Sequence, residues 1–415
     1  MAVVRPFKAI RPKEDVASRV AALPYDVYDR REAKAETERE PLSFLCIDRA
    51  ETQLSDDIDT YDDRVYRKAR SLMIKRLEDN TFIQDSDPAF YIYELVMDGR
   101  SQTGIVGCAS VDDYISNVIK KHENTREDKE IDRIRHVDTL SAQTGPIFLA
   151  YRDRDDIRAV ISKVTGDKPL YDFTAPDGII HRVWIVREDK DISTIEKAFS
   201  ETDSIYIADG HHRCASAVKV ALSRREKNPG YDGSEEFNYF LSVLFADSEL
   251  MIMDYNRVVK DLNGHTPSEI LGLLSKLGTL EKKECAYSPE KKGYVGVFLE
   301  DTWYSLKFSD ELKSDDAVEG LDVSVLQKHV LEPLFSIKDP RTDDRIGFVG
   351  GIRGLSELER RVRTDCAIAF SMHPTGIDEL FAVADRGLLM PPKSTWFEPK
   401  LRSGLFIHEI EPGIM

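Results

Sequence analysis

The segment Ser204-Ile-Tyr-Ile-Ala-Asp-Gly-His-His-Arg213 combines three local structural signals in one short stretch. Ser204 to Ala208 is mostly apolar and predicts a buried strand. Asp209-Gly210 then predicts a sharp turn, because glycine reaches backbone conformations that other residues avoid. The chain from His211 to about Arg225 keeps alanine, valine and leucine on one side and predicts a helix. The segment therefore predicts a strand–turn–helix unit.

This unit has the features of a phosphate-binding site. The first N–H groups of a helix lack intrahelical partners, and the helix dipole adds positive charge there. Arg213 carries a planar fork of donors that matches phosphate oxygens. Asp209 would lie beside them as a ligand for magnesium or as a general base. In the competing interpretation Asp209 only caps the helix and the histidines pack, but a doubled histidine followed by arginine at a helix start favours a functional site.

The surrounding pattern predicts an α/β protein of the α+β type. Asp98-Gly99 and residues 300–302 each separate two predicted strands, as in hairpins. Other strands follow helices, so we expect mixed sheets with hairpins and packed helices rather than a doubly wound parallel sheet. The predicted elements are a helix from Tyr61 to Asp79 with a capping box of Thr60 and Asp63, strands at Phe90–Met97, Thr103–Val111, Pro146–Tyr151, Val183–Val186, Asn238–Phe245, Leu250–Val259, Tyr294–Leu299 and Trp303–Phe308, and a helix from Pro267 to Leu277.

The polar stretch from Arg187 to Thr202 indicates a domain boundary near residue 190. We therefore expect an N-terminal α/β domain over residues 1–190. A second domain over 191–415 would open with the Asp-Gly-His-His-Arg element.

Composition limits the class of partner. The 415 residues carry a net charge of −17, which argues against binding to nucleic acid or to an anionic membrane. The longest apolar runs are too short to cross a bilayer, and the N-terminus lacks the apolar core of a signal peptide. Five scattered cysteines fit reduced, mostly buried thiols. We expect a soluble, cytoplasmic protein.

Two more segments mix acids, bases and hydroxyls. Lys121-His-Glu-Asn-Thr125 has the composition of a loop over a phosphorylated ligand, but a solvated charged loop is the default interpretation of such a run. Lys393-Ser394-Thr395 is similar to the end of a phosphate-binding loop, although the upstream glycines are missing. A turn that leads into a strand is favoured there. Hydrolase chemistry lacks support because no G-x-S-x-G motif is present.

Taken together, these segments resemble one family across essentially the whole chain, the domain-of-unknown-function family numbered 1015. The matching motifs are Arg5-Pro-Phe, Pro24-Tyr-Asp-Val27, Lys121-His-Glu-Asn-Thr125 with Asp132-Arg133, Gly145-Pro-Ile-Phe148, Ala208-Asp-Gly-His-His-Arg213, and Met390-Pro-Pro-Lys-Ser-Thr395 with Pro399-Lys-Leu401.

The Asp-Gly-His-His-Arg segment is also similar to the nucleotide-binding motif of the ParB/sulfiredoxin superfamily, which includes free-serine kinases. This resemblance implies that Gly210, His211, His212 and Arg213 hold phosphate and that Asp209 is a catalytic acid. Cys214 stands where many relatives have an aromatic residue. We take Glu123 as the second catalytic acid, by its position and composition.

The resemblance implies a phosphotransferase with an alcohol group as acceptor. We expect a nucleotide, ATP or ADP, and Mg²⁺, with free L-serine as the first candidate for the acceptor and O-phospho-L-serine as product. The residues expected at the acceptor are Lys121, His122, Thr125, Lys393, Ser394 and Thr395. The alternative is a ParB-like nucleotide-binding regulatory or interaction protein without metabolite turnover. The sequence does not determine the metal ligands or the oligomeric state.

Overall fold

A computed structural model describes residues 1–125, 127–411 and 413 and shows two compact units. Unit 1 consists of Met1–Lys120, Thr125–Leu250 and Pro399–Met415, and unit 2 of Lys121–Asn124 and Met251–Glu398. Helix α8, Asp189–Ser200, contains residue 190, and both of its flanks belong to unit 1. The boundary predicted near residue 190 is therefore wrong. A polar stretch there marks an exposed helix face rather than a linker.

Unit 1 is built around a mixed sheet, as predicted. The pairs β6–β11 and β8–β12 are parallel, and the other neighbouring pairs are antiparallel. In spatial order the strands are β6 (Ile119–Lys120), β11 (Ile205–Asp209), β8 (Ile147–Tyr151), β12 (Tyr239–Ala246), β5 (Arg100–Ser110), β4 (Phe90–Met97), β10 (Ile180–Val186) and β9 (Tyr171–Thr174), with β1 (Val4–Arg5) paired to β5.

The hairpin of β4 and β5 forms as its sequence predicts. Asp98 and Gly99 adopt φ of 51° and 79°, which the twist of a two-residue hairpin turn requires. Two short pairs complete the strands of unit 1. They are β2 (Ile10–Pro12) with β3 (Phe82–Gln84), and β7 (Ala142–Gln143) with β21 (His408–Glu409).

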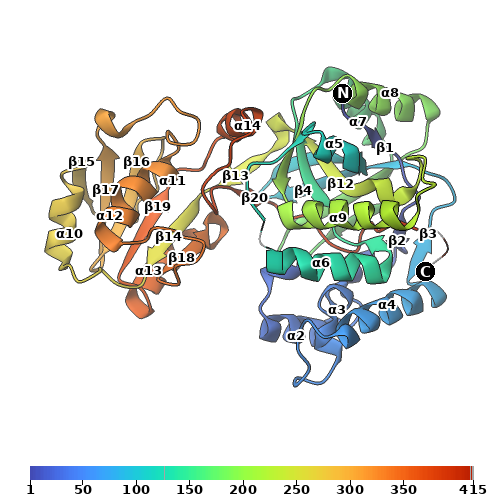
Figure 1. The fold of residues 1–415 in the computed structure, drawn as a ribbon, viewed down its shortest axis with the longest axis horizontal. Coiled ribbons are helices and arrows are strands. Elements are labelled where there is room, and N and C mark those ends of the chain that lie inside the picture. Colours follow the sequence, from blue (N-terminus) through green and yellow to red (C-terminus); the bar gives the residue numbers. More distant parts are fainter. Residues whose placement is uncertain (126, 412, 414–415) are drawn as a thin grey trace. The chain divides into compact units, whose positions relative to one another are not determined.

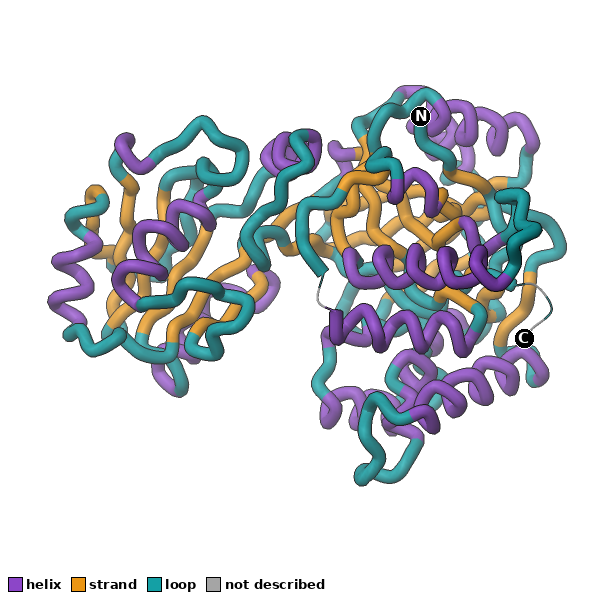
Figure 2. Tube along the Cα trace, viewed as in Figure 1, coloured by secondary structure: helices purple, strands orange, loops and turns teal. Residues whose placement is uncertain are grey.

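Helices cover the sheet of unit 1. One face presents apolar side chains such as Ile105, Leu149 and Ile207, and α9 packs Ala217 and Ala221 into the same core. α6 lies alongside α9 (Figure 1), and Figure 2 shows the strand layer behind these two helices. The other helices of unit 1 are α1 (Ala17–Val20), α2 (Arg30–Arg39), α3 (Leu45–Asp48), α4 (Asp63–Glu78), α5 (Val111–Ile115) and α7 (Asp155–Val164), while α6 spans Glu127–Leu140 and α9 spans His211–Lys227.

Unit 2 contains a separate sheet in which every neighbouring pair is antiparallel. Its order is β15 (Gly278–Lys283), β17 (Thr302–Phe308), β16 (Tyr294–Leu299), β19 (Ile368–Met372), β14 (Tyr255–Val259) and β18 (Ile346–Gly350). β13 (Met251–Met253) pairs with β20 (Trp396–Glu398). The helices are α10 (Pro267–Leu274), α11 (Asp322–Leu326), α12 (Glu332–Phe335), α13 (Gly354–Thr364) and α14 (Ile377–Asp385).

Three local predictions need correction. The single strand predicted at Leu250–Val259 is two strands, β13 and β14, which pair in different sheets. Helix α4 is capped by Asp62, which accepts a hydrogen bond from the Arg64 N–H, so the predicted Thr60 capping box is wrong. Helix α10 has its predicted Thr266 cap but ends at Leu274, because Gly278 already begins β15.

The five cysteines are free thiols, and all except Cys285 are buried, as expected. Within residues 1–125, 127–411 and 413, helices of membrane-spanning length and hydropathy are absent.

Candidate functional site

The turn between β11 and α9 forms as the sequence predicts. β11 ends at Asp209, α9 begins at His211, and Gly210 between them has φ of 92°. That left-handed conformation is strained for any residue with a Cβ. A Cβ at Gly210 would also lie 3.1 Å from Nε of Arg213. The glycine therefore permits both the turn and the close approach of the arginine.

The start of α9 offers backbone donors to an anion. Its first turn, which begins with His211, contains no acidic residue. Over the part of the chain that the structure describes, no side chain caps this helix. A helix start of this kind attracts negative charge because its N–H groups and the dipole point the same way. The phosphate site predicted at residues 210–213 therefore has a suitable backbone.

Asp209 is fixed by two donors. Its Oδ1 accepts the N–H of Gly210 at 2.8 Å, and Oδ2 accepts Nζ of Lys400 at 3.0 Å. Burial alone would raise the pKa of Asp209, but the positive charges of Lys400 and Arg213 hold that pKa below its usual range. Asp209 is therefore a carboxylate at neutral pH and a poor proton acceptor.

Lys400 is a functional candidate that the sequence analysis missed. It lies about 190 residues beyond Asp209 and reaches it because the C-terminal segment returns to unit 1. The signal in the sequence is the Pro399-Lys-Leu401 motif, which matches the family but has no role among the predicted site residues.

Arg213 folds back over the turn rather than extending outward. Its Nη1 donates to the Pro146 carbonyl at 2.6 Å. A Cβ at Gly145 would lie 3.4 Å from the same nitrogen. The Gly145-Pro-Ile-Phe148 motif thus contributes a glycine and a carbonyl that position the guanidinium. One edge of the predicted fork is used in this way, and Nε and Nη2 are the donors that can face a phosphate.

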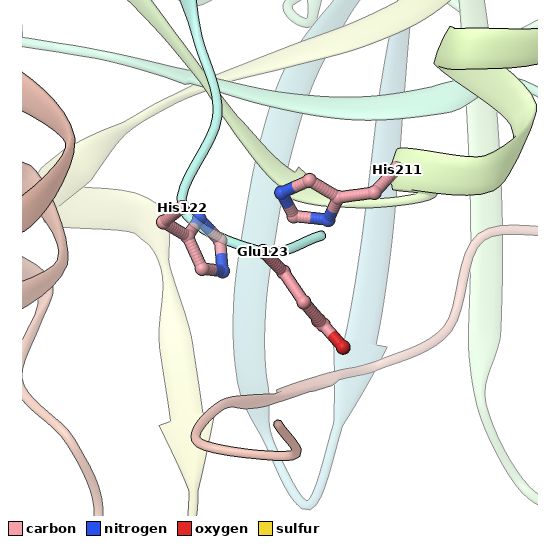
Figure 3. Close-up of side chains that lie close together, drawn as sticks. All are labelled: His122, Glu123 and His211. Carbon is pink, nitrogen blue, oxygen red and sulfur yellow. The ribbon is translucent and has the colours of Figure 1, made fainter. Parts of the chain in front are cut away.

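The histidines of the motif differ in exposure. His211 is buried and His212 is half-buried, both in the first turn of α9. Figure 3 shows His211 at the start of that helix, and it shows His122 and Glu123 on the loop that follows β6. The carbonyl of His212 accepts the hydroxyl of Ser216, four residues farther along α9, at 2.7 Å. This bond lies within the helix.

Unit 2 brings together the other two predicted segments. The carbonyl of His122 accepts the N–H of Met390 at 2.8 Å. The ring Nε2 of His122 lies 3.5 Å from the Thr395 hydroxyl. His122 is buried, Glu123 is half-buried and Lys121 is exposed. The Lys121–Asn124 segment is therefore packed against the segment that contains Lys393, Ser394 and Thr395.

Thr125 does not belong to that group. It lies in unit 1, where its hydroxyl donates to the carboxylate of Glu130, which also pairs with Lys219. Its contacts therefore give no support to the predicted role at the acceptor. They attach Thr125 to α6 through Glu130.

The Lys393 turn depends on a buried arginine. Lys393 adopts φ of 58°, and its carbonyl accepts Nη2 of Arg257 at 3.1 Å. Arg257 also donates to the Tyr255 carbonyl. Burial lowers the pKa of Arg257 to about 10, so it stays charged at neutral pH. The segment then continues into β20, which confirms the predicted turn into a strand. Arg257 has no role among the predictions from the sequence.

The charged run after Lys121 is not a solvated loop throughout. On α6, Asp132 and Arg133 are buried, and they pair at 2.7 Å. The Tyr66 hydroxyl donates to Asp132 at 2.9 Å, and the guanidinium of Arg133 lies 3.8 Å from the Tyr25 ring centroid. Composition predicts exposure for such residues, and only their partners on distant segments make burial possible.

A family model covers residues 4–324 of the chain, and its description reads "Protein of unknown function (DUF1015)". The chain belongs to this family. The match confirms the family that the motifs indicated. None of the curated proteins matches the chain.

Solved structures show a distant likeness. SbnI from Staphylococcus aureus, with a C-terminal truncation, is 11% identical with a TM-score of 0.37, over 73% of this chain and 87% of that one. A free serine kinase in complex with AMP is 16% identical with a TM-score of 0.34, over 75% and 92% of the two chains. A conserved hypothetical protein from Pyrococcus furiosus is 15% identical with a TM-score of 0.34, over 73% and 94%.

Proposed function

We propose that this protein is a small-molecule kinase that transfers a phosphate group from ATP or ADP to a hydroxyl, with free L-serine as the first candidate for the acceptor. The observation that carries this proposal is the turn at Asp209 and Gly210. It combines a left-handed glycine, an uncapped helix start and two cations, Arg213 and Lys400, next to one carboxylate.

The turn suits a nucleotide phosphate for electrostatic reasons. Phosphoryl transfer needs little covalent help from a protein and depends on positioning and on neutralising charge. In this proposal the N–H groups of α9 and the guanidinium of Arg213 hold the phosphates. Lys400 supplies a further positive charge, and Asp209 holds Lys400 in place. Asp209 is then a positioning residue rather than the base that the sequence suggested.

We propose Glu123 as the general base. β6 runs parallel to β11, with Ile119 opposite Ile205, so the chain leaves both strands at the same edge of the sheet. Glu123 follows the end of β6 by three residues. The acceptor oxygen would attack the terminal phosphorus and give its proton to Glu123. The bond from phosphorus to the bridging oxygen would break, and the shortened nucleotide would leave with that oxygen.

A magnesium ion bound by Asp209 does not fit this arrangement. Both carboxylate oxygens already accept hydrogen bonds, and the ammonium of Lys400 lies 3.0 Å from Oδ2. A divalent cation there would face a like charge. We assign no step to a metal, and the assay is run both with added magnesium and with a chelator.

The test is a transfer assay with purified protein. The protein is incubated with ATP or ADP and a pool of hydroxylated metabolites that includes L-serine, and products are separated by mass spectrometry. One new phosphorylated product is expected, with matching loss of nucleotide. Nucleotide binding without any product would contradict the kinase and select the ParB-like regulatory protein. Absence of nucleotide binding would contradict both.

A further inference from the structure

A cavity in unit 1 lies next to Arg213, and the nucleotide proposal does not use it. The volume of the cavity that is open to the centre of a water molecule is about 30 Å³. Its lining includes the polar side chains of Tyr25, Asp48, Arg133, His136, Thr144 and Arg213. Arg213 thus forms part of both the cavity wall and the Asp209–Gly210 turn.

Asp48 is the unusual group in this wall. It ends α3, and its side chain is 3% exposed. Its Oδ1 accepts the hydroxyl of Thr144 at 3.0 Å. Within the described residues this is the one hydrogen bond of the Asp48 side chain, and neither lysine nor arginine lies at salt-bridge distance from it. A buried carboxylate normally has several donors or a cationic partner, because leaving it without them is costly.

Among the described residues, neither Arg133 nor His136 donates a hydrogen bond to Asp48, although the charge of Arg133 acts on it from farther away. Arg133 is committed to Asp132 through Nε at 2.9 Å and Nη2 at 2.7 Å. His136 Nε2 lies 3.8 Å from Asp48 Oδ1 and 3.3 Å from the Ile47 carbonyl oxygen. Burial and the charge of Arg133 lower the pKa of His136, so its ring is neutral at neutral pH. Asp48 therefore lines the cavity with a carboxyl group that neither Arg133 nor His136 bonds directly.

We propose that this cavity binds the ammonium group of an amino acid, with Asp48 as its carboxylate partner. An ammonium group brings three donors and one positive charge, which is what the Asp48 carboxylate lacks. The inference rests on the proposed function, because the shared wall at Arg213 would set this amino acid beside the phosphate site. It gives the amino group of the proposed acceptor, L-serine, a partner, and it restricts other acceptors to hydroxyl compounds that carry an amino group.

Calorimetric titration tests this without nucleotide. L-serine, the other proteinogenic amino acids and ethanolamine are titrated one at a time, and 3-hydroxypropionate serves as serine without its amino group. We expect at least one amine to bind. Its analogue without the amino group should bind at least about tenfold more weakly, as for loss of a charge-assisted hydrogen bond. If no amine binds, or if the analogue binds equally well, the inference is wrong.

Two variants locate the site. Asp48→Asn should weaken amine binding by at least about tenfold. Asp155→Asn, at a carboxylate with 97% exposure, removes the same charge from the surface and should change nothing. If Asp48→Asn fails to fold, Ala217→Val offers a second route, because Ala217 also lines the cavity and a larger side chain would fill it. Full binding by either folded cavity variant would overturn the proposal.

The same samples separate this inference from the kinase proposal. ATP and ADP are titrated into wild-type protein and into Asp48→Asn, and both should bind nucleotide alike. Amine binding without nucleotide binding would contradict the kinase proposal and support the amine site. Nucleotide binding without amine binding would contradict the amine site and leave the kinase proposal standing. Potassium chloride is titrated as a further control. If the potassium ion displaces the amine and binds equally well by itself, the cavity is a site for a simple cation and the inference is wrong.

Discussion

Arg133 in unit 1 and Arg257 in unit 2 are both buried, but they have different kinds of partner. Near the α9 turn of unit 1, Lys400 pairs with Asp209 and Arg133 pairs with Asp132, while Arg213 donates to the Pro146 carbonyl. In unit 2 Arg257 is buried and donates to two backbone carbonyls. For the described part of the chain, no carboxylate lies at salt-bridge distance from it. A carboxylate partner compensates the charge of a buried cation, whereas the carbonyls that Arg257 binds leave its charge in place and fix the backbone of the Lys393 turn.

This difference predicts that the units contribute to separate steps. Residues of the α9 turn should set nucleotide affinity. Residues of the Lys121–Asn124 segment should set the rate, and Arg257 should set local order. Four measurements can break this assignment.

The largest effect is expected at Glu123. Glu123→Gln removes the proposed base and should lower the maximal rate by about 10²–10⁴-fold, while nucleotide affinity stays unchanged. The rate is measured in the transfer assay and the affinity by calorimetry. Glu127→Gln, an exposed glutamate nearby, is the matched control and should keep full activity. A fully active Glu123→Gln protein would remove Glu123 from the mechanism.

Arg213 should act on binding. Arg213→Ala should weaken nucleotide binding by about 1–3 kcal/mol, as for loss of a charge-assisted hydrogen bond. Arg213→Lys keeps the charge but loses the planar fork. Its nucleotide affinity should lie between those of the wild type and Arg213→Ala. Calorimetric titration with ATP and ADP measures this. An unchanged dissociation constant would place the phosphate elsewhere.

Arg257 should act on stability rather than on nucleotide affinity. Arg257→Met leaves the carbonyls of Tyr255 and Lys393 without their donor, at a cost of about 1–3 kcal/mol. Hydrogen exchange should become faster in β20 and in the preceding turn. Arg360→Met, on an exposed ion pair with Glu357, is the control. A change in nucleotide affinity with unchanged exchange would contradict the division between the units.

The smallest effect is a pH dependence at Asp209. The pKa of Asp209 is lowered in the folded protein, so its interaction with Lys400 contributes stability above the ordinary aspartate pKa of about 3.9. That contribution should shrink as the pH falls below this value. The side chains of Lys400 and Asp209 are 15% and 37% exposed, so solvent partly screens the pair, which is worth about 0.2–1 kcal/mol. Lys400→Met should therefore unfold more easily than wild type in urea at pH 7, and the gap should close in acid. A gap that widens in acid would contradict the assigned charges.

The sequence alone determined the local elements and the central turn. The hairpin at Asp98-Gly99, the capped start at Thr266 and the strand–turn–helix at Asp209 follow from periodicity and turn chemistry, which act between near neighbours in the chain. The mixed class of the sheet followed from the order of such elements.

Only the tertiary structure decided which distant residues meet. Lys400 reaches Asp209, and the Arg257 side chain holds the Lys393 turn, across long stretches of chain. The division into units, the split of β13 from β14 and the burial of Asp48 and Arg133 also depend on such contacts. A charged residue is polar in any sequence, and whether it is solvated or buried depends on the partners that folding brings to it.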